Sequence, residues 1–456
     1  MKKKHTVDMT KGGIYREIIA FAIPLVLTGI LQSLYNAADI VVVGKFTGKT
    51  ALAAIGSTSS AINLLVCVFV GLSSAGGVLV SRKFGAKNES GVSKAVHTSI
   101  ALSLIGGVLL TAAGIAAARP IMEAMDSPEN VIDLSVLYMR IYFSGITAIL
   151  VYNFGSAILR SVGDTKRPLY FLILSGIINV VLNLVFVIVF KMGVAGVGIA
   201  TVVSQVVSAA LVLGCLISTR ECYRLVPRKI KIHMSELGSI LYLGIPAGIQ
   251  SAVFSMSNVL IQSSINSVGE VAMAGNASAG SIEGIVYISM NAFHQAALTF
   301  VSQNYGAHNF ERIKKGMIAS CVTVTMGGLM LGSAVVFFGK ELLSLYSDVP
   351  DVIATGRIRL MYICLPYFLC GLMEVGVGGL RGIGASIMPM AVTIIGVCGV
   401  RIIAVMLGRP YETIQDLDIL YISYLVSWFI TGVAHFITFG IMFKNKKARV
   451  KLNEEQ

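Results

Sequence analysis

Three acidic residues and one arginine stand inside long apolar stretches of the sequence, where charged side chains are rare. Asp39 lies in LYNAADIVVVG and Glu283 in GNASAGSIEGIVY, while Glu374 precedes VGVGGLRGIG and Arg401 follows an apolar run. A charged group in the hydrocarbon of a bilayer costs about 3 kcal/mol on insertion scales, so those that persist usually serve a substrate path, an ion path or a proton relay. These four residues are therefore the first candidates for chemistry.

Asp39 is the strongest candidate for carrying an ion. Tyr35 lies one helical turn before it on the same face. A carboxyl group kept away from bulk water suits a proton or cation carrier; the alternative is an aspartate near an outer loop that is already in water. Asn179 and Asn183 share a helix face, Asn153 lies in the preceding apolar run, and such neutral amides can hydrogen-bond a carboxylate. These asparagines form either a polar pocket with Asp39 or ordinary hydrogen bonds between helices.

The second half of the chain has its own polar residues. Glu374 stands where Asn153 stands in the first half. A buried arginine needs a partner, and we expect Glu374 to be the partner of Arg401. The pair is either a structural ion bridge, or a cationic substrate or proton competes with Arg401 for Glu374. Glu283 is a second candidate for a cation contact, whereas His294 is expected to be a hydrogen-bonded histidine.

The elements that position these residues are membrane-spanning helices. Of the 456 residues 55% are hydrophobic and 13% charged, which is too little charge to cover a soluble protein. The apolar runs approach or exceed the roughly 20 residues that cross a bilayer. The sequence predicts an all-α membrane protein with twelve transmembrane helices. We expect them at 16–43, 52–80, 93–118, 134–159, 168–190, 194–218, 238–265, 272–302, 316–339, 357–380, 387–407 and 415–443.

A repeat relates the two halves of the chain. The segment NFGSAILRSVGDTKRP (153–168) recurs as EVGVGGLRGIGASIMP (374–389), an offset of 221 positions, and the same offset places GAKN (85–88) on GAHN (306–309). Membrane proteins built from internal repeats are mostly transporters, with their sites near the repeat interface. The repeat predicts two pseudo-symmetric six-helix lobes, parallel repeats related by an axis along the membrane normal.

The longest polar connection separates these lobes. We expect an N-terminal lobe at 1–219, a basic cytoplasmic linker at 220–237, a C-terminal lobe at 238–443 and a basic cytoplasmic tail at 444–456. Pro24 and Pro246 lie at matching places in the first helix of each lobe. A proline inside a helix removes a hydrogen bond and permits bending, so each is either a fixed kink or a hinge.

The net charge of +13 fits a membrane topology. Lysines and arginines gather in alternate loops, as the positive-inside rule requires, which predicts a multi-pass protein of the cell (cytoplasmic) membrane with both termini cytoplasmic. We expect no nucleic-acid partner, because no basic helix with interleaved aromatics is present. The sequence has no HExxH or P-loop motif, and its seven cysteines include no CxxC pair. It therefore predicts no enzyme, no cofactor and no metal cluster.

Several segments resemble the multidrug and toxic compound extrusion (MATE) transporters, closest to the DinF-like bacterial branch. They are LYNAADIVVVG with Pro24 upstream, the pair LRSVGDTKRP and LRGIGASIMP, and INVVLNLVF. The resemblance implies export of organic, often cationic, compounds in exchange for H+ or Na+, with Asp39 as coupling residue and Asn153 and Asn179 around it. Asn183 stands where a second acid is common, which leaves the ion open; a Na+ ion would bind near Asp39. Glu374 matches an acid of a related branch, whose second acid is absent here.

The predicted function is an ion-coupled antiporter that exports organic, cationic compounds by alternating access between two lobes. Its partners are organic small molecules, H+ or Na+ and the lipid bilayer, and we expect a monomer. The alternative is a lipid-linked saccharide flippase of the same superfamily. Such a flippase lines its cleft with several cations, whereas the sequence shows only Arg401 clearly inside the membrane.

Overall fold

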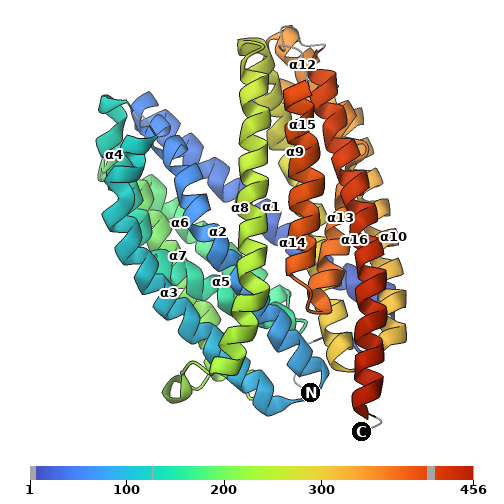
Figure 1. The fold of residues 1–456 in the computed structure, drawn as a ribbon. Coiled ribbons are helices and arrows are strands. Elements are labelled where there is room, and N and C mark those ends of the chain that lie inside the picture. The colour runs from blue at the N-terminus through green and yellow to red at the C-terminus, as the bar shows by residue number, and fades with distance from the viewer. Residues whose placement is uncertain (1–6, 126–127, 408–415, 455–456) are drawn as a thin grey trace. The chain divides into compact units, whose positions relative to one another are not determined.

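The computed structural model describes residues 7–125, 128–407 and 416–454, and this part of the chain is helical, with no strand. Two short π-helical segments, Val185–Val189 and Ile394–Gly399, extend α6 and join α14 to α15. The prediction of an all-α fold is confirmed. The helices are α1 (Ile14–Phe46), α2 (Lys49–Gly85), α3 (Glu89–Ala124), α4 (Glu129–Ser144), α5 (Ile146–Ser161), α6 (Lys166–Leu184), α7 (Gly193–Ser218), α8 (Met234–Asn266), α9 (Glu270–Gly306), α10 (Phe310–Phe337), α11 (Gly339–Ser344), α12 (Pro350–Cys364), α13 (Tyr367–Gly382), α14 (Ile387–Thr393), α15 (Val400–Leu407) and α16 (Leu417–Glu454) (Figure 1).

Most of these helices are long and apolar enough to cross a membrane. Among the described residues nine helical segments meet that requirement singly, and the pairs α4–α5 and α12–α13 meet it together, with bends of 48° and 43°. The runs 134–159 and 357–380, expected to be single helices, are therefore broken. The first break is at Gly145, where a Cβ would lie 2.6 Å from Cγ2 of Val202. The second is at Pro366, which has no N–H to continue a helix.

The contacts within the chain divide it into two compact units. The first contains Leu27–Gly248, and the second contains Asp8–Val26 together with the described residues from Ile249 onward. Both α1 and α8 therefore pass from one unit to the other along their length. In each helix the change comes two residues after a proline, Pro24 in α1 and Pro246 in α8. The lobe limits at 219 and 238, which follow the longest polar connection, stay a prediction.

The repeat is visible in the backbone. Asn88 caps α3 by accepting a hydrogen bond from Gly91 N at 2.8 Å, and Asn309 caps α10 in the same way, from Arg312 N at 3.2 Å. A capping asparagine satisfies one of the free N–H groups at a helix start. Residues in the left-handed region recur with the 221-residue offset of the sequence repeat. They are Lys87 with His308, Gly48 with Gly269, and Gly163 with Gly384.

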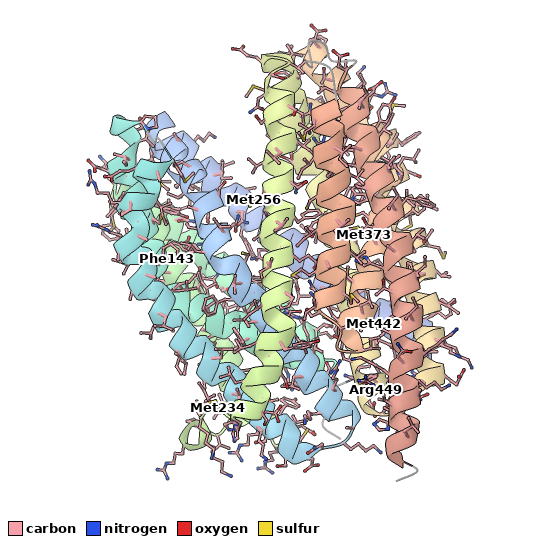
Figure 2. The ribbon with its side chains drawn as sticks, in the orientation of Figure 1. Phe143, Met234, Met256, Met373, Met442 and Arg449 are labelled. Carbon is pink, nitrogen blue, oxygen red and sulfur yellow. The ribbon has the colours of Figure 1, made fainter. Side chains whose placement is uncertain are left out.

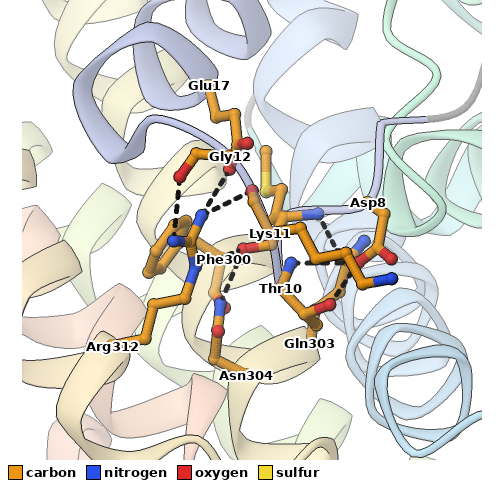
Figure 3. Close-up of polar contacts among 10 residues, drawn as sticks. Asp8, Thr10, Lys11, Gly12, Glu17, Phe300, Gln303, Asn304 and Arg312 are labelled. Atoms are coloured by element: carbon orange, nitrogen blue, oxygen red, sulfur yellow. Dashed lines mark hydrogen bonds and ion pairs between the residues drawn. The ribbon is translucent and has the colours of Figure 1, made fainter.

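The segment before α1 is held by polar side chains of the second unit (Figure 3). Met9 is fully buried; its N–H donates to Gln303 Oε1 at 2.9 Å, and its carbonyl accepts from Asn304 Nδ2 at 3.1 Å. Arg312 donates to the carbonyls of residues 9, 11 and 12 and to Glu17 Oε2, the last at 2.9 Å. These contacts position the start of α1 on α9 and α10.

The segment before α8 is held in a corresponding way within the first unit. His233 N donates to Thr98 Oγ1 at 3.1 Å, and Val226 N donates to His97 Nε2 at the same distance. Both partners lie on α3. The first helix of each half of the chain therefore starts against helices of the other half.

Each unit has an apolar core and an exposed apolar surface (Figure 2). Phe143 is fully buried in the first unit, where its ring occupies the space that a Cβ on Gly114 would need. Met373 is buried in the second unit, while Met256 on α8 is 62% exposed. Exposed apolar side chains along helices of this length are what a lipid environment requires.

Candidate functional site

Asp39 lies on α1 opposite two asparagines of α6. Its Oδ1 accepts a hydrogen bond from Asn183 Nδ2, and the same Nδ2 donates to Asn179 Oδ1 at 3.2 Å. Asp39 is partly buried, whereas both asparagines are buried. The structure thus brings together three of the four residues predicted to surround the coupling ion, although their role in coupling stays a prediction.

A small cavity of the first unit contains Asp39. Its volume is about 60 Å³, and the residues around it come from α1, α6 and α7. This volume suits an ion or a few water molecules and is far below the several hundred Å³ that a drug-sized molecule needs. The lining residues are Gln32, Tyr35, Asn36, Asp39, Leu172, Ser175, Gly176, Asn179, Thr201, Ser204 and Gln205.

The asparagines leave an acceptor beside this cavity. Asn183 Oδ1 is buried and has no hydrogen-bond partner among the described residues. An oxygen without a donor, next to a carboxylate, is a site for a proton-bearing group or a small cation. Among the described residues no group of three or more His, Cys, Asp or Glu side chains could hold a metal ion. Any cation at Asp39 would therefore depend on amide and hydroxyl oxygens as further ligands.

The fourth predicted residue, Asn153, is not part of this cavity. It lies on α5, is partly buried and does not line the space around Asp39. The prediction placed it there because a neutral amide can hydrogen-bond a carboxylate and because the family resemblance implies an asparagine of this helix around Asp39. Helices α5 and α6 have few contacts with each other, and α5 packs instead on α2, α3 and α7.

A larger cavity lies in the second unit and contains Glu283 and Arg401. Its volume is about 430 Å³, within the range of small-molecule sites. Helices α8, α9, α12, α13, α15 and α16 contribute side chains to it. The lining residues are Phe254, Ser255, Asn258, Ile261, Gln262, Ile265, Gly280, Glu283, Gly284, Tyr287, Arg359, Tyr367, Cys370, Arg401, Tyr424 and Trp428.

Glu283 accepts hydrogen bonds from Arg359, which lies in the expected helix 357–380 but was not predicted as a site residue. Its Oε2 accepts from Nη2 of Arg359 at 2.8 Å and from Nε at 3.1 Å. Arg359 follows Arg357 by two positions, which is about 200° around a helix. The two side chains therefore point in opposite directions. This spacing was the sequence signal that one of the two arginines faces the interior of the protein. Arg359 is thus a second buried arginine at this cavity, besides Arg401.

Arg401 does not pair with Glu374, as the sequence analysis expected. Its Nη1 donates to Asn258 Oδ1 at 3.0 Å, and its guanidinium lies 4.0 Å from the ring centroid of Tyr424. The π-helical segment Ile394–Gly399 directly precedes α15. Because a π-helix has more residues per turn, it changes the face on which Arg401 emerges. A straight helix was assumed in the prediction.

Glu374 instead pairs with a buried histidine. His294 Nδ1 lies 3.1 Å from Glu374 Oε2 and 2.8 Å from the carbonyl oxygen of the same residue. His294 is therefore hydrogen-bonded, in line with the expectation. Glu374 does not line the cavity that contains Glu283 and Arg401. The three predicted residues of the second half thus divide between two places.

Comparison with known proteins gives consistent matches over most of the chain. The sequence model described as MatE matches twice, at residues 24–185 and 246–407. The "Probable multidrug resistance protein YpnP" of Bacillus subtilis (strain 168) is 30% identical over 388 residues, covering 85% of this chain and 87% of that protein. The "Probable multidrug resistance protein YoeA" of the same organism is 26% identical over 450 residues, covering 97% of each.

The fold also matches solved structures. One is described as the outward-facing conformation of a multidrug resistance MATE family transporter of the MOP superfamily. It superposes with a TM-score of 0.89 at 22% identity, covering 98% of this chain and all of that one. The two MatE matches start 222 positions apart, within one position of the 221-residue offset of the sequence repeat, so sequence and fold agree on a duplicated architecture.

Proposed function

Because the chain belongs to the MatE family, whose members are multi-pass membrane transporters of small compounds and not enzymes, we propose that it is an ion-coupled antiporter. It exports organic compounds from the cell in exchange for H+ or Na+. The relatives named as multidrug resistance proteins support efflux as the direction of transport. Cationic cargo stays a prediction from the family resemblance.

The observation that carries the proposal is the cavity around Asp39. A carboxylate inside a membrane protein, with amide partners and room for a small ion, can alternate between a free and an occupied state. Binding of H+ or Na+ removes the negative charge, which changes the free energy of the surrounding contacts. Alternating access between the lobes then exchanges the ion for cargo.

The placement in the cell follows from the charged loops. We infer from the basic connections that both termini lie on the cytoplasmic side of the cell membrane. The two segments that precede α1 and α8 carry lysines and arginines and would both lie on that side. We expect the transporter to act as a monomer, since each unit has its own core and its own cavity.

The proposal is tested in proteoliposomes with separately imposed proton and sodium gradients and a panel of fluorescent organic dyes. One of the two gradients should drive dye movement by the wild-type protein, and Asp39→Asn should abolish that response. Asp133→Asn is the matched control, because it makes the same change at an exposed position of α4 in the same unit. Dye movement that is independent of both gradients would overturn the proposal.

A further inference from the structure

The larger cavity of the second unit has an unusual charge balance. Glu283 is the acidic residue among its lining residues, and Arg359 and Arg401 are the basic ones. Arg359 is fully engaged, because Nε and Nη2 donate to Glu283 and Nη1 donates to Asn276 Oδ1 at 3.0 Å. Glu283 and Arg359 therefore neutralise each other, and Arg401 remains as an additional positive charge.

Arg401 has hydrogen-bond donors that no acceptor among the described residues satisfies. It is 1% exposed, and its hydrogen-bond acceptor in the described part of the chain is a neutral amide, that of Asn258. Its Nε and Nη2 are buried without a hydrogen-bond partner among the described residues. A buried charge without a counter-charge is strongly destabilising. A protein that retains such an unpaired buried charge is expected to use it to bind a ligand of opposite charge.

The walls around Arg401 are aromatic. The guanidinium lies 4.0 Å from the ring centroid of Tyr424 and 5.3 Å from that of Phe254. Trp428 packs against Tyr424, with ring centroids 5.7 Å apart, and its Nε1 is buried without a hydrogen-bond partner in the described structure. Two residues that line the cavity, Arg401 and Trp428, thus carry N–H donors without an acceptor among the described residues, and aromatic rings lie beside them.

We propose that this cavity binds an aromatic organic compound that carries an anionic oxygen group, such as a carboxylate, sulfonate or phosphate. The anionic group accepts hydrogen bonds from Nε and Nη2 of Arg401, since guanidinium nitrogens match the geometry of oxyanions. The ring packs among Phe254, Tyr424 and Trp428 by offset or edge contacts. The statement that this ligand is cargo rests on the proposed export function, whereas the binding itself does not.

Trp428 makes the site directly observable, because it is the only tryptophan in the chain. We suggest titrating the detergent-solubilised full chain with three nitroaromatic quenchers of equal size: 4-nitrobenzenesulfonate, 4-nitrobenzyl alcohol and 4-nitrobenzylammonium. The sulfonate should quench Trp428 saturably, with an affinity at least tenfold above those of the alcohol and the ammonium compound. Equal affinity for the three probes, or preference for the ammonium, would overturn the proposal.

Substitutions identify the group that selects the anion. Arg401→Gln should weaken sulfonate binding at least tenfold and leave alcohol binding unchanged, and Arg401→Lys should restore part of the loss. Arg357→Gln removes the same charge at an exposed position of α12, outside the cavity, and should change nothing. Wild-type sulfonate affinity in Arg401→Gln would reject the assignment. If that variant does not fold, the three-probe comparison on the wild type still decides.

Two further measurements distinguish the proposed aromatic-anion site from a simple anion site and from the ion-coupling site at Asp39. Methanesulfonate, which lacks a ring, should displace the nitroaromatic sulfonate at least tenfold less well than benzenesulfonate does. Equal displacement would show a simple anion site and overturn the aromatic part of the proposal. Asp39→Asn should bind the sulfonate as the wild type does, because the titration uses no gradient. Failure of ion coupling and failure of this site are therefore distinguishable.

Discussion

Tyr35 and Gly176 line the cavity around Asp39 and are in close contact with each other. The Tyr35 ring lies against the Cα of Gly176, and its hydroxyl donates to the carbonyl of Ile173 at 3.4 Å. A Cβ at position 176 would be 1.9 Å from Cζ of the ring. No rotation about the side-chain bonds of residue 176 can relieve this contact, because the added atom is fixed to the backbone. The tyrosine or the helix must move.

Gly176→Ala should therefore destabilise the protein by about 1–3 kcal/mol and reduce gradient-driven transport. Thermal unfolding in detergent measures the first effect, and dye flux in proteoliposomes measures the second. Gly214→Ala on α7 is the control, since a Cβ there meets nothing within 4 Å. If both alanine variants behave alike, the contact with Tyr35 does not shape the site.

The ion pair between Glu283 and Arg359 predicts a large effect on stability. The two side chains are 12% and 10% exposed, and removal of one partner leaves the other charge buried. We expect Glu283→Gln to lower the free energy of unfolding by about 3–5 kcal/mol. The exposed pair of Arg119 with Glu123 gives the comparison, because Glu123→Gln should cost at most about 1 kcal/mol. Denaturant titration of both variants checks the difference, and equal small losses would contradict it.

At the scale of the helices, the sequence located the elements well but not their ends. The run 194–218 agrees with α7 within one residue, whereas α10 begins at Phe310, six residues before the expected 316. An apolar run in the sequence indicates only the part of a helix that lies in the bilayer. The helix itself can continue into water as far as its capping residue, so its ends lie outside the apolar run. Asn309 starts α10 among charged residues, and α16 continues through the basic stretch after residue 443 to Glu454.

The sequence predicts those site residues that lie on regular α-helices, because their spacing then shows which side chains share a face. Asn179 and Asn183 are four residues apart on one α-helical face, and the structure places both with Asp39. The expected pair of Glu374 and Arg401 is wrong, because Glu374 pairs with His294 and Arg401 donates to Asn258 after a π-helical segment. Such a segment has no clear sequence signal, and the placement of Asn153 required knowledge of which helices pack together.

The two prolines mark the points at which α1 and α8 pass between the compact units. If they are hinges, Pro24→Ala and Pro246→Ala should restore a helical hydrogen bond, keep or raise thermal stability, and slow transport. The double variant should be slower than either single one. Pro120→Ala is the control, because Pro120 lies inside α3, which belongs to the first unit alone. Unchanged transport in the double variant would favour fixed kinks.

At the scale of the whole molecule, the duplication extends to backbone detail. The left-handed residues Lys87 and His308, each with φ near 55°, occupy equivalent turns, and the asparagine that follows each one caps the next helix. The cavities are not equivalent, however. The first unit offers a small site with a carboxylate, and the second offers a larger site with an additional arginine. The two halves thus have different chemistry on one repeated framework.

The proposed topology predicts the reactivity of Cys222, which lies between α7 and α8. A membrane-impermeant maleimide should label it from the cytoplasmic side only, with Cys222→Ser giving the background. Burial, with the nearby charges of Glu89 and Glu221, raises the pKa of this thiol. The thiolate is the reactive form, so labelling should be slow at neutral pH and accelerate as the pH rises beyond the range usual for cysteine. Labelling from the outer side would contradict the assigned orientation.

The most direct test of the account is the ion movement that an imposed cargo gradient produces. Proteoliposomes loaded with a transported dye, and with reporters for luminal H+ and Na+, would show which ion flows against the dye. The account predicts a counterflow of one ion by the wild type and by Asp133→Asn, and none by Asp39→Asn in a protein that still folds. An undiminished counterflow in Asp39→Asn would show that the carboxylate in the first unit does not couple transport.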